Sequence, residues 1–330
     1  MAIRRYNPGY KPPATLALVG VNVGIAIIDM LSGGMLERLF WARGIDIQYG
    51  QYWRLFTCAW VHADIMHIAF NAYGIYVLGM LTEQLHGWRT LLLIYLASLL
   101  GGSALAIAFM DPGTPLLGAS GAAYGLFGAV LGSLYARTGS IADLWKIPLA
   151  RTLLIWLAFG VYLSLRPGVS MLGHLGGFVP GVVLGMFFEH RYRRELDIYH
   201  KLGAALVCAS IVLLLAFCIA PFTRSSWYAA RALRAYESGD IQRGDGLLAD
   251  AEKRNRANEG SRRLLNHLRT WRKGHDLLPR QYTVEVLRLP LTHAQGIPGA
   301  VRPDGRVEAY RYLPALEEVP ESLEPSAPPD

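Results

Sequence analysis

The fold is decided by two glycine-rich stretches, which read GASGAAYGLFGAVLGSLYA at residues 118–136 and GHLGGFVPGVVLG at residues 173–185. In each stretch glycine returns every three or four residues, so on a helix the glycines form one smooth stripe. Stripes of small residues let two helices in a membrane approach closely. Ser120 and His174 stand near the starts of these stretches. We therefore predict two tightly packed helices that bring both side chains to a similar depth.

Composition indicates that the first two thirds of the chain need a bilayer. Of the 330 residues, 52% are hydrophobic and only 17% are charged, whereas a soluble domain carries about a quarter charged residues. The formal net charge is +7. Because arginines at the ends of apolar runs anchor and orient spans, we predict no nucleic-acid partner. Cys58, Cys208 and Cys218 have no metal-ligand spacing and indicate no disulfide framework, and we expect no cofactor and no metal.

Apolar stretches of about 20 residues are long enough to cross a bilayer as helices. Seven qualify or come close, at residues 14–31, 64–82, 90–110, 120–136, 150–165, 172–188 and 202–222. The first could be read as a signal peptide, but without a convincing cleavage site we favour a retained span. Lysine and arginine gather in the connections on the side of the N-terminus. Because these residues favour the cytoplasmic side, we expect a cytoplasmic N-terminus and an extracytoplasmic C-terminal region.

Polar side chains inside apolar runs are candidates for function, because a bilayer disfavours them. His67 and Asn71 are four residues apart, so both lie on one helix face and could hold one oxygen atom. The alternative is that they only form hydrogen bonds between helices. For His62, at the start of the same span, we favour that structural role.

A serine and a histidine are the candidate nucleophile and base. Ser120 lies between Gly118 and Gly121 at a predicted helix start, where a serine is usually a cap. Free N–H groups at such a start also point at a developing anion, and Tyr124 lies four residues further on the same face. General-base activation would need His174 within hydrogen-bond reach of Ser120. No carboxylate in the spans is an evident third member, so we predict a dyad.

Taken in order, these residues resemble the rhomboid family of intramembrane serine proteases. The resemblance covers residues 14–189 and rests on an ordered set: Trp53-Arg54, His62, His67, Asn71, Gly118-Ala119-Ser120-Gly121, Tyr124, His174 and Gly177. It implies that Ser120 is the nucleophile and His174 the general base. It also implies an oxyanion hole formed by the Ser120 N–H, His67 and Asn71, with Gly118 and Tyr124 shaping the site for substrate. Trp53 and Arg54 would hold the first outer loop in the interface.

The implied fold is all-α, with a six-helix rhomboid-like core and one further C-terminal transmembrane helix. From the polar sequence that follows, we expect a small soluble, mostly helical domain. The substrates that the resemblance implies are single-span membrane proteins, cut within or next to the span. Two alternatives stay open. One is a catalytically inactive rhomboid-like factor that binds membrane proteins, and the other is a transporter or channel, which can also carry glycine stripes and midspan polar groups.

We divide the chain into six parts: a cytoplasmic N-terminus (1–13), the catalytic core (14–189), a basic cytoplasmic connection (190–201), the seventh transmembrane helix (202–224), an extracytoplasmic soluble domain (225–313) and a disordered tail (314–330). We expect an integral protein of the bacterial inner (plasma) membrane, in contact with the lipid bilayer and with transmembrane protein substrates.

The soluble domain is predicted to start with a helical hairpin at 227–254, similar to one tetratricopeptide repeat, followed by a helix around 259–273. Because one repeat cannot bury a continuous core, the hairpin must lean on that helix, on the next segment or on a partner. Strands are predicted at 282–289 and 306–313. The domain either recruits a protein partner or is dispensable, and in both cases we expect the catalytic core to work without it.

Overall fold

The computed structural model describes residues 9–221 and 223–254, together with residues 262, 264–266, 268–269 and 272. Within these residues the chain is all-α, and the only paired backbone outside helices is an isolated antiparallel bridge between Ala42 and Leu116. The strands expected at 282–289 and 306–313 and the tail at 314–330 lie outside the described residues, as do residues 1–8.

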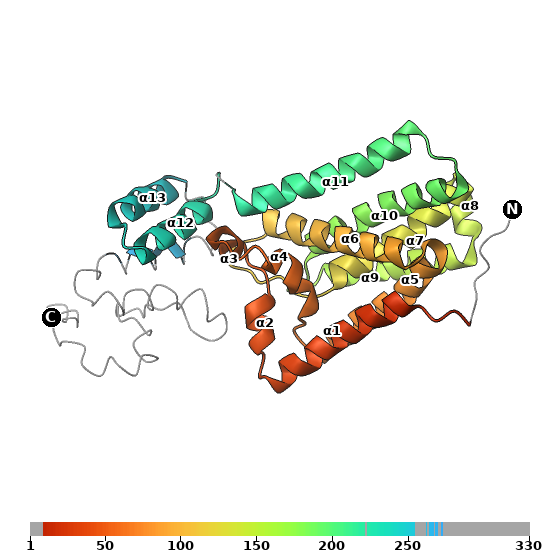
Figure 1. Ribbon diagram of the computed structural model, residues 1–330, viewed down its shortest axis with the longest axis horizontal. Coiled ribbons are helices and arrows are strands. Elements are labelled where there is room, and N and C mark those ends of the chain that lie inside the picture. The colour runs from red at the N-terminus through yellow and green to blue at the C-terminus, as the bar shows by residue number, and fades with distance from the viewer. Residues whose placement is uncertain are drawn as a thin grey trace. The chain divides into compact units, whose positions relative to one another are not determined.

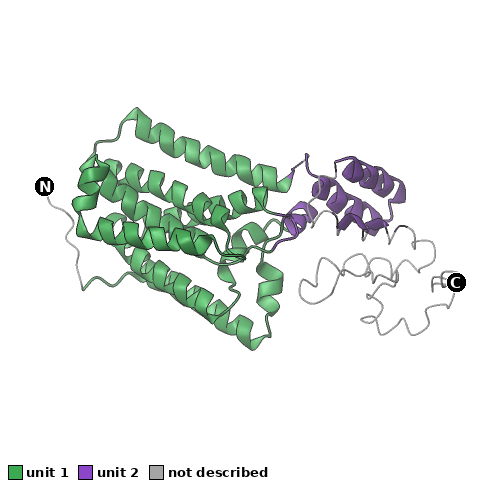
Figure 2. Ribbon diagram, turned by 180° about the vertical axis from the view of Figure 1, so that it is seen from behind, with its two compact units in different colours: residues 1–43, 51–110, 115–219 green, residues 44–50, 111–114, 220–330 purple. Residues whose placement is uncertain are grey.

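The chain forms two compact units, coloured separately in Figure 2. Unit 1 comprises residues 1–43, 51–110 and 115–219. Its elements, labelled in Figure 1 where there is room, are α1 (Pro13–Leu31), α2 (Met35–Phe40), α4 (Arg54–Thr57), a 3-10 turn (Cys58–Trp60), α5 (Ile65–His86), α6 (Trp88–Phe109), α7 (Ser120–Thr138), α8 (Ile141–Lys146), α9 (Pro148–Ser164), α10 (Met171–Arg193) and α11 (Ile198–Ile219).

Five of the described helices are long and apolar enough to cross a membrane, namely α1, α5, α6, α10 and α11. The apolar helix α9 is shorter, with 17 residues, and α7 has 19 residues of which several are glycine. The chain is therefore an integral membrane protein. The number of seven spans stays a prediction, because α9 is shorter than these five helices and α7, although as long as α1, is less apolar.

Helices α6, α7 and α10 lie side by side (Figure 1) and meet through their glycines. A side chain at Gly177 or Gly181 of α10 would collide with the backbone of Gly121 or Gly125 of α7. At Gly102 of α6, an added Cβ would lie 2.6 Å from the Gly173 carbonyl oxygen. The close packing expected from the two glycine stripes is thus present, and α7 and α10 run in the same direction with their first residues at one end.

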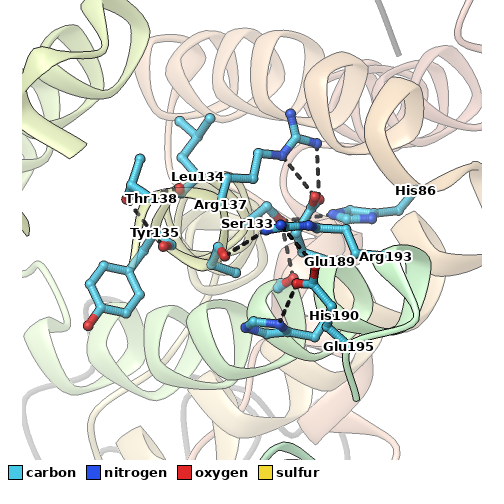
Figure 3. A network of polar contacts seen from close by, with 12 residues as sticks. His86, Ser133, Leu134, Tyr135, Arg137, Thr138, Glu189, His190, Arg193 and Glu195 are labelled. Atoms are coloured by element: carbon cyan, nitrogen blue, oxygen red, sulfur yellow. Dashed lines mark hydrogen bonds and ion pairs between the residues drawn. The ribbon is translucent and has the colours of Figure 1, made fainter. Parts of the chain in front are cut away.

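A network of polar side chains joins the other ends of α7 and α10 (Figure 3). Arg137 of α7 donates two hydrogen bonds to Glu189 of α10, Nε to Oε1 at 2.9 Å and Nη2 to Oε2 at 3.0 Å. Glu189 is 3% exposed, so the pairing compensates a buried charge. Arg193 donates to the Ala136 carbonyl oxygen at 3.2 Å and pairs with Glu195. These contacts fix the register of the two helices that carry Ser120 and His174.

Unit 2 comprises residues 44–50, 111–114 and 220–330. Its named helices are α3 (Gly44–Tyr49), α12 (Ser225–Glu237) and α13 (Ile241–Lys253), and α12 packs against α13. The soluble domain with a tetratricopeptide-like hairpin stays a prediction. Gly244 of α13 makes room for the ring of Tyr236. The described residues between 262 and 272 are helical, where a helix was predicted around 259–273.

The core of unit 2 contains a helix that is distant in sequence. The buried residues of this core are Ile45, Ala229, Ala232, Leu233, Tyr236, Leu248, Ala251, Leu264, Leu265 and Leu268. Ile45 belongs to α3, in the loop between α2 and α4. On the same helix, the Tyr49 hydroxyl donates a hydrogen bond to Glu237. The Arg234 guanidinium lies over the Tyr49 ring, with Cζ 5.1 Å from the ring centroid. The hairpin therefore leans on α3 as well as on the helical residues that follow it.

Candidate active site

The chain enters α7 through a left-handed glycine immediately before Ser120. Gly118 has a φ of +107°, which a residue with a Cβ rarely adopts. Its N–H donates to the Cys58 carbonyl oxygen at 2.8 Å, and the Ala119 N–H donates to His62 Nε2 at 3.4 Å. The first bond of the helix runs from the Ala123 N–H to the Ala119 carbonyl oxygen at 3.0 Å. The Ser120 N–H thus lies among the helix-start donors that an anion can use.

Ser120 and His174 form a hydrogen bond. The distance from Ser120 Oγ to His174 Nε2 is 2.8 Å, although 54 positions separate the residues. Both side chains are partly exposed. The Tyr124 ring is stacked on the His174 ring, with centroids 4.1 Å apart and an interplanar angle of 8°. This arrangement meets the distance requirement for a histidine that removes a serine proton.

His67 and Asn71 of α5 lie against Gly118, two residues before Ser120. A Cβ added to Gly118 would lie 2.5 Å from His67 Nε2 and 3.6 Å from Asn71 Nδ2. Asn71 is 5% exposed, and its Nδ2 is buried with no hydrogen-bond partner among the described residues. A buried amide donor without a partner is costly. Its position beside the start of α7 makes it available to an oxygen atom of a bound peptide.

His62 supports this loop from the other side. It is 8% exposed, accepts the Ala119 N–H, and packs edge-to-face on His67 with ring centroids 5.1 Å apart. Because His62 Nε2 accepts the Ala119 N–H, the proton of the neutral ring is on Nδ1. The structural role expected for His62 stays a prediction, to which this geometry gives a physical basis.

Trp53 and Arg54 lie in the loop before the 3-10 turn. Arg54 is buried, and its Nη1 donates to the carbonyl oxygens of Trp41 at 2.8 Å and Arg38 at 3.1 Å. Its Nε also donates to Gln51. Trp53 is 54% exposed. Arg54 therefore ties together the backbone of the first outer loop, while the neighbouring indole faces outward.

A serine that the sequence did not single out completes the contacts of His174. Ser164 Oγ, on α9, lies 2.6 Å from His174 Nδ1 and 3.3 Å from the Tyr124 hydroxyl. Ser164 is 3% exposed. In the sequence it is one polar residue in an apolar run, with no spacing that relates it to Ser120 or His174, so no pattern could have indicated it.

A second serine–histidine contact occurs about 20 Å further along α7 and differs in chemistry (Figure 3). His86 Nε2 lies 2.8 Å from Ser133 Oγ. The Ser133 hydroxyl donates to the Ala129 and Gly185 carbonyl oxygens, at 2.7 and 3.2 Å, so His86 must be the donor to Ser133. Ser133 is also 0% exposed. It can neither transfer its proton to His86 nor reach a substrate, which leaves Ser120 as the candidate nucleophile.

Comparisons with known proteins match the segment that holds these residues. Residues 49–191 match the Rhomboid domain. RHOMBOID-like protein 1 of Arabidopsis thaliana is 37% identical over 138 residues, which cover 42% of this chain and 35% of that protein. RHOMBOID-like protein 2 of Arabidopsis thaliana is 39% identical over 157 residues, covering 47% of this chain and 48% of that protein.

A bacterial protein is also similar. The Rhomboid protease GluP of Bacillus subtilis (strain 168) is 29% identical over 176 residues, which cover 52% of this chain and 34% of that protein. In these three comparisons, less than half of the relative's length is matched. The Rhomboid domain match runs from residue 49 in the first outer loop to residue 191 in α10, and it includes Ser120, His174 and Ser164.

Proposed function

Because this chain belongs to the rhomboid family, we propose that it is an intramembrane serine endopeptidase that uses Ser120 and His174 as a catalytic dyad. The observation that carries the proposal is the 2.8 Å hydrogen bond between Ser120 Oγ and His174 Nε2, formed by partly exposed side chains at the start of two helices. A relative named as a rhomboid protease supports the same activity.

In the acylation step, Ser120 Oγ attacks the carbonyl carbon of the scissile peptide bond while its proton moves to His174 Nε2. The negative charge that develops on the carbonyl oxygen is stabilised by the Ser120 N–H, His67 and Asn71. Asn71 suits this role because its buried Nδ2 has no other partner among the described residues. The bond to the leaving nitrogen then breaks, and His174 returns the proton to that nitrogen.

In the deacylation step, a water molecule takes the place of the leaving amine. His174 Nε2 accepts a proton from the water as its oxygen attacks the ester carbon, and the same donors hold the second oxyanion. Collapse of this intermediate breaks the bond to Ser120 Oγ, which recovers its proton from His174. The products are two peptide segments and the free enzyme.

We propose that the substrates are single-span membrane proteins, cut within or next to their span. The site residues belong to the first two turns of α5, α7 and α10, so the site lies near one face of the membrane rather than at its centre. Following the distribution of lysine and arginine, we assign that face to the extracytoplasmic side, with a cytoplasmic N-terminus. The relatives described above come from a plant and a bacterium, so the bacterial inner membrane stays a prediction.

The test uses the purified full chain in detergent, a fluorophosphonate probe and a single-span substrate. We expect covalent labelling and cleavage by the wild type, and neither by Ser120→Ala or His174→Ala. The matched control is Ser210→Ala, since Ser210 is exposed on α11 and should be irrelevant. Binding of the substrate without labelling or cleavage in the wild type would favour the inactive, membrane-protein-binding alternative. Full activity in Ser120→Ala would contradict the proposal outright.

A further inference from the structure

Both nitrogen atoms of the His174 ring have a hydrogen-bond partner, and the partner of Nδ1 determines which nitrogen carries the proton. Nε2 faces Ser120, while Nδ1 lies 2.6 Å from Ser164 Oγ. Taking the proposed function as given, we propose that Ser164 is a positioning residue that holds His174 in the tautomer able to act as a base. The dyad of Ser120 and His174 is then supported by a third side chain, which holds the base in position.

The Ser164 hydroxyl has one proton to donate, and this decides the direction of each of its hydrogen bonds. Its single proton is donated to the Gly160 carbonyl oxygen, one turn earlier on α9, at 2.7 Å. The two lone pairs remain for the contacts with His174 Nδ1 and the Tyr124 hydroxyl. Ser164 must therefore accept both bonds. The first of them requires that the proton of neutral His174 is on Nδ1.

With the proton on Nδ1, the lone pair of Nε2 points at Ser120 Oγ. Only this tautomer can accept the Ser120 proton, because an Nε2–H would donate to Ser120 instead. When His174 becomes an imidazolium, Nδ1–H keeps its acceptor. The bond is then charge-assisted and stronger than a bond between neutral groups. Ser164 thus stabilises the protonated ring in the position that a carboxylate takes in soluble serine proteases.

The surroundings of Ser164 keep its hydroxyl in place. Only Ala150, Leu153 and Ser164 of α9 are buried, whereas Trp156 and Tyr162 are 58% and 60% exposed. Ser164 is thus a polar residue on a helix that is otherwise largely apolar and exposed. At Gly160, the missing side chain leaves room for the Tyr124 hydroxyl, which lets that hydroxyl approach Ser164. A buried serine with three polar contacts on such a helix is well explained by a role at His174.

The first test compares two variants of equal shape. Ser164→Thr keeps the hydroxyl and Ser164→Val replaces it with a methyl group, and both side chains are β-branched on the same helix. We expect kcat of Ser164→Val to be about 10–100-fold below that of Ser164→Thr, because a hydrogen bond to a charged group is lost. KM should be the same for both. Equal kcat values in the two variants, or a difference confined to KM, would overturn the proposal.

The second test does not depend on activity. Nitrogen-15 NMR of the histidine-labelled full chain reports which ring nitrogen carries the proton, and His174→Gln identifies the His174 signals. We expect an Nδ1–H signal for neutral His174 in the wild type. An Nε2–H tautomer there would overturn the positioning role, whether or not the protein cleaves peptides. If the Nδ1–H tautomer is found but Ser120 neither labels nor cleaves, the proposed function fails while the Ser164 contact stands.

Discussion

The Tyr124 ring lies flat on the His174 ring, with 4.1 Å between the centroids and 8° between the planes. Its hydroxyl reaches past the imidazole to Ser164, at 3.3 Å. Tyr124 therefore touches the candidate base with its face and the candidate positioning residue with its polar end. Stacking limits rotation of the imidazole, and the hydrogen bonds of Ser164 limit its displacement. The two effects can be separated by substitution.

We expect Tyr124→Phe to keep most of the activity and Tyr124→Ala to lose much more. Phenylalanine retains the stacked ring and removes one long hydrogen bond, which contributes about 1 kcal/mol or less, roughly a fivefold effect on kcat. Alanine removes the ring that holds His174. The measurement is kcat for both variants, with Tyr162→Phe, on the exposed part of α9, as the control. Similar decreases of kcat in Tyr124→Phe and Tyr124→Ala would mean that the Tyr124 hydroxyl, and not the stacked ring, supports activity.

Asn71→Ala should reduce kcat without abolishing cleavage. Removal of one oxyanion donor costs on the order of 10²–10³ in a soluble serine protease, and two further donors remain here, so we expect the lower end of that range. His67→Ala should act in the same direction. Phe70→Leu is the control on α5, because Phe70 is 64% exposed. Unchanged kcat in both Asn71→Ala and His67→Ala would show that these side chains only join helices.

The packing of the core and the position of the dyad candidates could be predicted from the sequence, because both depend on regular spacing. Glycine at every third or fourth position places the stripe on one helix face, and the structure has Gly177 against Gly121 and Gly181 against Gly125. Once two parallel helices pack this closely, Ser120 and His174 at their starts must come near each other. The distance of 2.8 Å between Ser120 Oγ and His174 Nε2 is consistent with this packing.

Ser164 and α3 could not be predicted, for a common reason. The role of Ser164 depends on where α9 packs, and a single serine in an apolar run carries no signal of its neighbours. Likewise, α3 has six residues, too few to be stable as an isolated helix. Its Ile45 is buried in one core with Leu233 and Leu268, which lie about two hundred positions later in the chain. Long-range contacts of this kind leave no periodic pattern in a single sequence.

Activity should rise from acidic pH toward neutral pH, because His174 must be neutral to accept the Ser120 proton. As the pH falls through the pKa of His174, the fraction of enzyme with neutral His174 decreases. At pH values below this pKa, the rate drops about tenfold for each pH unit. The measurement is kcat/KM against pH, with tryptophan fluorescence at each pH to exclude unfolding. A rate that increases below about pH 5, where protonation of His174 should lower it, would indicate that a carboxyl group acts in place of the histidine.

The last prediction concerns a chain that ends at Ile219 and so lacks residues 220–330. We expect this chain to keep Ser120 labelling, because every residue of the candidate site belongs to unit 1. We also expect residues 44–50 to become sensitive to proteolysis, because Ile45 loses the core in which it is 6% exposed. Limited proteolysis with mass mapping of the cut sites measures this effect, and the full chain is the reference.

A second variant distinguishes the loss of packing around Ile45 from the absence of residues 220–330. Ile45→Ala in the full chain removes one buried side chain of α3, so it should also increase cleavage at 44–50, but less than the truncation does. Ile141→Ala, at a 73% exposed position, should leave the cut pattern unchanged. Protection of 44–50 in the truncated chain would mean that α3 does not need residues 220–330. Loss of Ser120 labelling in a folded, membrane-inserted truncated chain would mean that residues 220–330 are part of the working enzyme, and that the core does not function alone.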